Sequence, residues 1–369
     1  MNICILGDAR NVHIIRLASG LARRGIRLHV VTHKPGAIPG ATVERFSVPK
    51  AGLRQPYRWA DRRRRYLREF FLKFDVVNVH FLDDWALGGL LDDAGTDRAD
   101  LIVTAWGSDI VDPPGETPAS ADLEAARIDL LRRADAVTAC GPTFAGMVEK
   151  FAGLDSDSVR VVPFGVDTRL FRTSEEGAKA RGLRGVVGFF KGFRPVYGAI
   201  DLIRAIPKVQ RACPDVKWEM IGEGSSLDEC QCMAHEAGAW PHVAWLPRQR
   251  HRELPGFLER WSISVIPSVH EAFGVAALES SAMEIPVVGS DVAGLRDTVV
   301  DGVTGTLVPP KNPEALADAL IALVRDDSLR HLMGLAGRRR VIEQFEEENV
   351  LDQWVELYQT ARERRAVMV

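Results

Sequence analysis

The segment Pro267–Pro286, PSVHEAFGVAALESSAMEIP, carries two glutamates, Glu271 and Glu279, on either side of a Phe-Gly turn. An apolar run, Ile263–Ile266, precedes the segment, and a helix-favouring run, Val275–Met283, follows the turn. This order predicts a strand, a tight loop and the start of a helix. Because the first turn of a helix exposes unpaired N–H groups under a partial positive charge, the segment predicts a binding site for a phosphate or diphosphate.

The residues around the turn suggest how such a ligand would be held. Gly274 allows the backbone to approach closely, so the loop Ala272–Phe273–Gly274–Val275 can receive the diphosphate. Glu279, about one turn into the helix, is placed to accept hydrogen bonds from two vicinal ribose hydroxyls. Glu271 points toward the group beyond the diphosphate, which is the geometry of a nucleotide-sugar. The alternative is that both glutamates are solvated surface residues, as most charged side chains are.

Further motifs follow this segment in order. They are the turn Gly289–Ser290, the G-L-x-D loop Gly294–Asp297 and the D-G-x-x-G-x-L-V-P-P run Asp301–Pro310. Together with P-S-x-x-E-x-F-G-x-x-x-x-E, this block resembles the donor half of the family-4 retaining glycosyltransferases of the GT-B fold. The resemblance implies an α/β protein with two Rossmann-like doubly wound domains facing across a cleft. It also implies a UDP- or GDP-linked sugar as donor and a hydroxyl acceptor on a glycan, lipid or small metabolite.

Apolar strands alternate with amphipathic helices along the whole chain, the pattern of parallel sheets covered on both faces. The strands expected in the first half are Asn2–Leu6, Leu28–Thr32, Val76–His80, Leu101–Ala105, Ala136–Ala139 and Val159–Val162. Those expected in the second half are Val186–Phe189, Lys217–Ile221, His242–Trp245, Ile263–Ile266, Val287–Val288 and Thr306–Val308. Ligands of such sheets bind outside the carboxyl ends of the strands, so the site is expected there.

The length of 369 residues suits two domains of similar size. We expect an acceptor domain at residues 1–168, a nucleotide-sugar donor domain at 169–346 and a C-terminal helix at 347–369. The run Val161–Phe171 resembles the inter-domain crossing of the family. The resemblance also implies that the last helix, expected at Val350–Arg365, returns to the first domain.

Positive charge is needed to offset the leaving diphosphate. In the family a basic residue and then a Lys-Gly pair follow the first strand of the second domain. Here Lys191 resembles the basic residue, but Tyr197–Gly198 stand in place of the Lys-Gly pair, so Arg194 is the candidate that compensates. Gly222 and Gly224 resemble the G-x-G turn that lies beside the nucleotide in the family.

The resemblance implies a reaction without a protein nucleophile, in which the acceptor attacks the face that the diphosphate leaves. Cations and amides on the leaving group supply much of the catalysis, so we expect no cofactor and no obligatory metal. The D-x-D of the chain, Asp155–Ser156–Asp157, is interpreted as a turn. Two alternatives stay open: a nucleotide-sugar 2-epimerase or hydrolase on the same fold, and a catalytically silent nucleotide-sugar binding protein.

Polar and aromatic residues follow the expected strands of the first domain. They are Asp8, Asn11 and His13 after the first strand, His80 at the end of the third, and Trp106 and Asp109 after the fourth. Trp106 stands where many relatives carry a histidine. Asp109, His13 and His80 are candidates for binding or deprotonating the acceptor, because a base must lie within hydrogen-bond reach of its hydroxyl. A structural role is the alternative for each.

Composition excludes several other classes of protein. A net charge of −3 gives no reason to expect nucleic acid as a partner. The five cysteines form no C-x-x-C pair and are expected to be reduced. Without a signal-peptide pattern or a long apolar run, the protein is expected to be cytoplasmic. The run Arg54–Arg68, with seven arginines and one acid, suggests an anionic acceptor or peripheral contact with the inner face of a membrane; a solvated helix face is the alternative.

Overall fold

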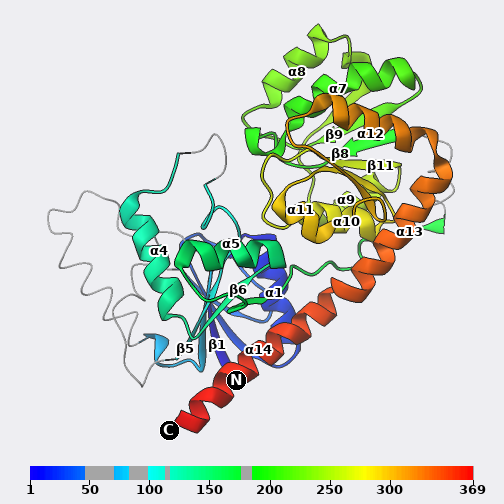
Figure 1. Cartoon of the computed structure of the whole chain (residues 1–369). Coiled ribbons are helices and arrows are strands. Elements are labelled where there is room, and N and C mark those ends of the chain that lie inside the picture. The colour runs from blue at the N-terminus through cyan, green and yellow to red at the C-terminus, as the bar shows by residue number, and fades with distance from the viewer. Residues whose placement is uncertain (46–69, 83–98, 113–116, 176–184, 369) are drawn as a thin grey trace. The chain divides into compact units, whose positions relative to one another are not determined.

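The computed structural model describes residues 1–45, 70–82, 99–112, 117–175 and 185–368, which form two compact units (Figure 1). The first unit comprises Met1–Asp112, Thr117–Pro163 and Glu348–Val369, and the second comprises Phe164–Glu347. The basic run Arg54–Arg68 lies outside the described residues. Each unit is built on one parallel sheet, so the α/β fold class expected from the alternation of strands and helices is confirmed.

The sheet of the first unit has the order β3-β2-β1-β4-β5-β6-β7 in the described residues. Its strands are β1 (Asn2–Leu6), β2 (Arg27–Thr32), β3 (Thr42–Arg45), β4 (Val76–His80), β5 (Asp100–Thr104), β6 (Ala136–Ala139) and β7 (Val159–Val161). Six of them agree with the predicted strands to within one residue at each end. Sequence reasoning missed β3, an edge strand that is exposed at both ends and lacks the apolar run typical of a buried parallel strand.

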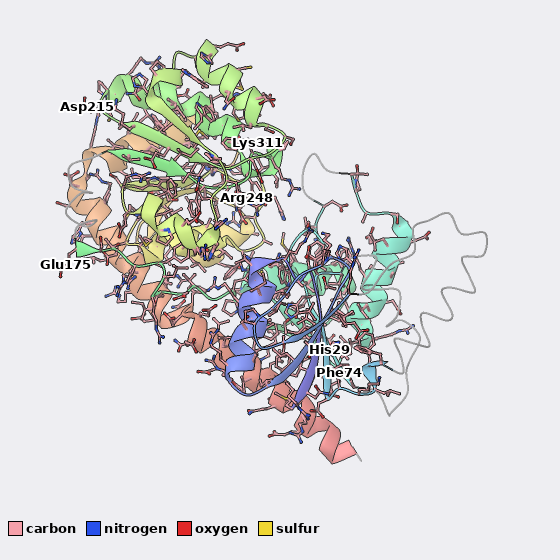
Figure 2. All side chains as sticks on the ribbon, turned by 180° about the vertical axis from the view of Figure 1, so that it is seen from behind. His29, Phe74, Glu175, Asp215, Arg248 and Lys311 are labelled. Atoms are coloured by element: carbon pink, nitrogen blue, oxygen red, sulfur yellow. The ribbon has the colours of Figure 1, made fainter. Side chains whose placement is uncertain are left out.

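The helices of the first unit pack on this sheet. They are α1 (Val12–Arg23), α4 (Ala121–Arg133), α5 (Pro142–Ala152) and α14 (Glu347–Met368). Asn11 is the N-cap of α1, and its side chain accepts a hydrogen bond from the backbone N–H of His13 at 2.8 Å. Near the sheet edge, His29 of β2 lies beside Phe74, with ring centroids 5.5 Å apart (Figure 2).

α14, the last helix of the chain, packs against the first unit. Its apolar face buries Val350, Leu351, Trp354, Leu357 and Tyr358. The helices α1 and α14 meet at Gly20, where a Cβ atom would lie 2.5 Å from Leu351. The Tyr358 hydroxyl accepts a hydrogen bond from Asn78 of β4 at 2.9 Å. The helix is therefore part of the core of this unit.

The sheet of the second unit has the order β10-β9-β8-β11-β12-β13 in the described residues. Its strands are β8 (Val186–Phe189), β9 (Lys217–Ile221), β10 (Val243–Leu246), β11 (Ile263–Ile266), β12 (Val287–Ser290) and β13 (Gly305–Val308). The predicted strands are confirmed to within two residues at each end. Every residue of β8 and β11 is buried, because both faces of these strands are covered, which is usual in parallel sheets.

Helices cover both faces of the second sheet (Figure 1). They are α7 (Ala199–Ala212), α8 (Leu227–Glu236), α9 (Leu254–Leu258), α10 (Val275–Ala282), α11 (Ala293–Thr298), α12 (Pro313–Arg325) and α13 (Asp327–Gln344). Short 3-10 turns lie at Pro195–Tyr197, Trp240–His242 and His251–Glu253. In the described part of the chain, no helix has both the length and the apolar character needed to cross a bilayer.

Both strand orders contain a point at which the chain reverses direction along the sheet. It lies between β1 and β4 in the first unit and between β8 and β11 in the second. Loops leaving neighbouring strands at such a switch point diverge to opposite faces and leave room for a ligand at the carboxyl end of the sheet. These two places are where the fold offers sites.

Candidate functional site

Glu271 and Lys191 meet at the switch point of the second unit, although 80 positions separate them in sequence. Lys191 follows β8, Glu271 follows β11, and the ammonium group donates to Oε2 of the carboxylate. Ser268 donates its hydroxyl to the same oxygen at 3.1 Å. The Lys191 ammonium also lies 4.4 Å from the centroid of the Tyr197 ring, a cation–π distance. The two charges are thus held in place with only 12% and 14% of their side chains exposed.

The loop Pro267–Gly274, here called the glutamate loop, is held in place by a glycine at its end and by a backbone contact with α11. Gly274 has φ 91°, a left-handed conformation that glycine adopts without strain, and α10 begins at the next residue. Gly294 of α11 donates its N–H to the carbonyl of Glu271 at 2.8 Å. A Cβ atom on Gly294 would lie 2.2 Å from the Phe273 nitrogen, so only glycine permits this contact. The glutamate loop therefore rests directly on the backbone of α11.

Phe273 turns its ring into the protein. It is 3% exposed, and its ring centroid lies 5.9 Å from that of Phe164 and 5.9 Å from that of Phe345. Its side chain therefore anchors the glutamate loop, and any contact of this residue with a ligand comes from its backbone. The start of α10 remains the natural anion-binding feature of the loop, because the N-terminus of a helix carries a partial positive charge.

The segment Phe190–Gly198, here the lysine loop, packs on the turn containing Gly222 and Gly224. A Cβ on Gly222 would lie 2.2 Å from the Lys191 carbonyl oxygen, and one on Gly224 would lie 2.3 Å from that of Phe193. The glycines thus allow two strand-end loops to touch. At the same turn, the exposed Arg248, labelled in Figure 2, pairs with Glu223; the distance between Nη1 and Oε1 is 3.3 Å.

The other end of the lysine loop leads into α7. Gly198 caps this helix with φ 65°, and a Cβ there would lie 1.9 Å from the carbonyl oxygen of Pro267. Gly198 stands where the family has the glycine of its Lys-Gly pair, and a glycine is needed there because the backbone of Pro267 lies so close. Arg194 is exposed, with its guanidinium carbon 5.9 Å from the centroid of the Tyr197 ring.

Glu279 lies on α10, and its partner is a histidine that sequence reasoning missed. Its Oε1 lies 2.6 Å from Nε2 of His251, which the 3-10 turn after β10 supplies. Glu279 has 7% of its side chain exposed and His251 has 24%. The ring of His251 packs on Phe171 at a centroid distance of 5.1 Å. No motif marks His251, because its role depends on a loop that leaves a different strand.

A pocket of about 220 Å³ lies at the switch point of the first unit. Residues after four different strands line it: Asp8, Asn11 and Ile14; His33 and Lys34; His80 and Phe81; and Trp106. Three of the predicted acceptor-side residues, Asp8, Asn11 and Trp106, are therefore brought together with His80. Trp106 also contacts the ring of His13 edge to face at 5.9 Å.

Asp109 is held by the backbone around it. Its carboxylate accepts hydrogen bonds from the N–H groups of Trp106 at 3.0 Å, Gly107 at 2.7 Å and Leu82 at 3.1 Å. Burial raises the pKa of this carboxyl, against the lowering effect of these bonds. Completely buried, Asp109 ties the turn after β5 to the end of β4. Holding this turn in place is a structural role for Asp109, the alternative to deprotonating the acceptor.

His80 is buried at the end of β4, and burial lowers its pKa to about 3. The indole N–H of Trp106 donates to its Nδ1 at 3.3 Å. An imidazole that resists protonation so strongly is a poor base for an acceptor hydroxyl at neutral pH. His80 is therefore better suited to hydrogen bonding than to the deprotonation considered for it.

Metal binding finds no support in these side chains. In the described ranges, no group of three or more histidine, cysteine, aspartate or glutamate residues is arranged to hold a metal ion. At the second switch point, the carboxylate of Glu271 is instead in direct contact with the ammonium group of Lys191.

Comparisons with known proteins show the family to which the chain belongs. The family model described as glycosyl transferases group 1 matches residues 173–340, and that described as Glycosyltransferase Family 4 matches residues 11–170. The D-inositol 3-phosphate glycosyltransferase of Nocardia farcinica is 30% identical, over 89% of this chain and 80% of the relative. The chain belongs to the family-4 glycosyltransferases. The corresponding protein of Corynebacterium diphtheriae is 27% identical to this family-4 glycosyltransferase, over 89% and 85% of the two chains.

Solved structures show the same fold as this family-4 glycosyltransferase. Sucrose-phosphate synthase from Thermosynechococcus elongatus superimposes with a TM-score of 0.82 at 19% identity, covering 98% of both chains. Anabaena Alr3699/HepE, in complex with UDP and glucose, gives a TM-score of 0.80 at 20% identity, covering 97% of this chain and 99% of the other. The GT-B fold implied by the motifs is thereby confirmed.

Proposed function

We propose that this family-4 glycosyltransferase moves a hexosyl group from a UDP- or GDP-linked donor to a hydroxyl acceptor with retention of anomeric configuration. The observation that carries the proposal is the contact between Lys191 and Glu271 beside the N-terminus of α10. It brings together a cation, a carboxylate and the N-terminus of a helix at one switch point. That set fits a diphosphate joined to a sugar. HepE, solved with UDP and with UDP-glucose, supports a nucleotide-sugar as donor.

Each part of the site has a role in breaking the bond between the anomeric carbon and the diphosphate. Negative charge grows on the diphosphate as the bond breaks, and the sugar becomes oxocarbenium-like. Lys191 and the start of α10, with a partial charge of about +0.5, stabilise the leaving group, and Arg194 adds a second cation. Glu271, which fixes Lys191, faces the growing positive charge of the sugar. The departing diphosphate oxygen takes the proton of the acceptor hydroxyl, so no protein nucleophile is required.

Nucleotide binding is the first test of this proposal. A ligand that binds only the folded state raises the melting temperature by mass action, so UDP or GDP should raise it more than CDP or ADP does. Turnover is then measured as acceptor-dependent release of the nucleotide, and the anomeric configuration of the product is read by NMR. Release without acceptor would favour the hydrolase, and binding without turnover would favour the silent binding protein.

The cations that we assign to the leaving group make a metal unnecessary. Turnover is therefore expected to continue unchanged in EDTA, because Lys191, Arg194 and the α10 amides take the role that a divalent cation would have. The measurement is the initial rate of nucleotide release with and without chelator. Loss of the rate in EDTA, with recovery on adding Mg²⁺, would contradict this part of the proposal.

His251 is expected to orient Glu279 toward the donor ribose. Replacing His251 by alanine removes the 2.6 Å contact and leaves a carboxylate that is 7% exposed without this partner. Hydrogen bonds to charged groups contribute about 1.5 to 3 kcal/mol, so the donor KM should rise about tenfold or more while kcat changes little. His235→Ala, an exposed position on α8 of the same unit, is the matched control. An unchanged donor KM would remove His251 from the site.

A further inference from the structure

We infer that the pocket of the first unit binds an uncharged, hydroxyl-rich part of the acceptor, with His80 Nε2 donating a hydrogen bond and Asp8 accepting one. The inference rests on the proposed function, since it names the class of acceptor that this glycosyltransferase takes. It is carried by the hydrogen-bond chemistry of His80 and by the charge balance of the pocket lining, two independent observations.

The contact with Trp106 decides which nitrogen of His80 carries the proton. An indole N–H can only donate, so Nδ1 of His80 must accept and carries no hydrogen. A neutral imidazole has one N–H, which places it on Nε2. The pKa of about 3, caused by burial, keeps the ring neutral at physiological pH. His80 therefore presents a permanent donor and no second acceptor.

That donor has no partner within the described residues. Nε2 of His80 is buried, and no described group accepts a hydrogen bond from it. The residue is 3% exposed and is one of the residues lining the pocket. A buried donor without an acceptor is unfavourable for the folded protein, so an oxygen atom of a ligand in this pocket would satisfy it.

The two formally charged residues that line the pocket, Asp8 and Lys34, offset each other. Lys34 donates to Oδ2 of Asp8 at 3.0 Å, and Arg10, which does not line the pocket, pairs with Oδ1 of the same carboxylate at 3.4 Å. Partial burial would raise the pKa of Asp8, but bonds from the Arg10 backbone and from Lys34 outweigh it and lower the pKa, so the carboxylate stays ionised. A phosphate would compete with Asp8 for Lys34 while lying beside a carboxylate. A hydroxyl can donate to Asp8 and accept from His80 without breaking the ion pair.

Size and shape agree with a single ring. Pockets for drug-sized ligands measure about 300 to 1,000 Å³, so a volume of about 220 Å³ suits one ring of a larger acceptor. Ile14, Phe81 and Trp106 supply apolar surface between the polar groups. Alternating apolar faces and hydroxyl-binding groups are the features that a sugar or cyclitol ring requires.

The tautomer of His80 is tested by NMR of protein labelled with 15N-histidine. We expect the His80 signals, assigned by their absence from His80→Gln, to show a neutral ring protonated at Nε2 between pH 5 and 8. His331→Gln, exposed on α13, is the control for the labelling pattern. Trp106→Phe keeps a ring but removes the indole donor, and should let the proton distribute over both nitrogens. A charged ring, or a proton on Nδ1 in the unmodified protein, would overturn the inference.

The acceptor class is tested with matched pairs of probes, titrated by NMR into the protein saturated with UDP or GDP. The pairs are myo-inositol with inositol 3-phosphate and glucose with glucose 6-phosphate. At least one neutral probe should bind about tenfold more tightly than its phosphorylated partner. His80→Leu should abolish that preference, and His80→Gln, which restores an N–H donor, should largely retain it. If no neutral probe binds, or if the phosphorylated partners bind more tightly, the inference fails. The proposed function would survive that failure, because nucleotide binding and acceptor-dependent nucleotide release are measured separately.

Discussion

Replacing Glu271 by glutamine is expected to lower kcat/KM for the nucleotide-sugar by about a hundredfold or more. Glutamine has nearly the same shape but no charge, so it removes the carboxylate that fixes Lys191 and faces the anomeric carbon. The loss should be mainly in kcat, because the interaction strengthens as charge develops in the transition state. Initial rates over a range of donor concentrations measure both parameters.

Glu236→Gln is the matched control for this change, since Glu236 is exposed on α8 of the same unit. It should retain full activity. An unchanged thermal shift with UDP or GDP would show that the Glu271 variant is folded and binds nucleotide. The Lys191–Glu271 pair can be examined further with Lys191→Met, alone and combined with Glu271→Gln. Two groups that act together show less than additive losses of activity. Full activity of the Glu271 variant, or strictly additive losses, would contradict the role that we give to the Lys191–Glu271 contact.

Replacing Trp354 by alanine is expected to lower the free energy of unfolding of the first unit by about 3 to 5 kcal/mol. The Trp354 side chain is 5% exposed, with its ring 5.7 Å from that of Tyr358 and 5.4 Å from that of His80. Removing it leaves a cavity where α14 covers the sheet. Urea denaturation followed by circular dichroism measures the change.

The control for this variant is Leu332→Ala on α13, where the leucine is 63% exposed. Truncation at such a position should change stability by no more than about 0.5 kcal/mol. A loss of less than about 1 kcal/mol for Trp354→Ala would mean that α14 does not form part of the first unit's core. Because Trp354 also contacts His80, its removal should weaken the binding of the neutral probes as well.

The elements of the fold could be predicted because each depends on local sequence. Val186–Phe189 is apolar throughout and Ile263–Ile266 is apolar except at Ser264, as is usual for parallel strands buried on both faces. β3 could not be predicted in the same way, because among the described strands it pairs with β2 alone and leaves part of its surface in water. Its existence depends on a neighbour already in place.

The donor side of the site was marked in sequence by a contiguous block of motifs. The pairs of residues that contact each other within this site were not marked in sequence. Lys191 and Glu271 lie 80 positions apart, and His251 and Glu279 lie 28 apart, so only the folding of neighbouring strands brings them within hydrogen-bond reach. On the acceptor side, the motifs did not distinguish Asp109, which caps a turn, from His80, which lines a pocket.

The sequence by itself determined the alternation of strands and helices, the membership of a family and the loop that should meet a diphosphate. These follow from periodicity and from motifs in which the informative residues are close along the chain. Only the tertiary structure decided which side chains pair. It also decided that the Asp109 carboxylate accepts hydrogen bonds from backbone N–H groups, and which nitrogen of His80 carries the proton. Those properties arise from burial and from contacts between distant residues, because an ionisable group responds to what surrounds it in space.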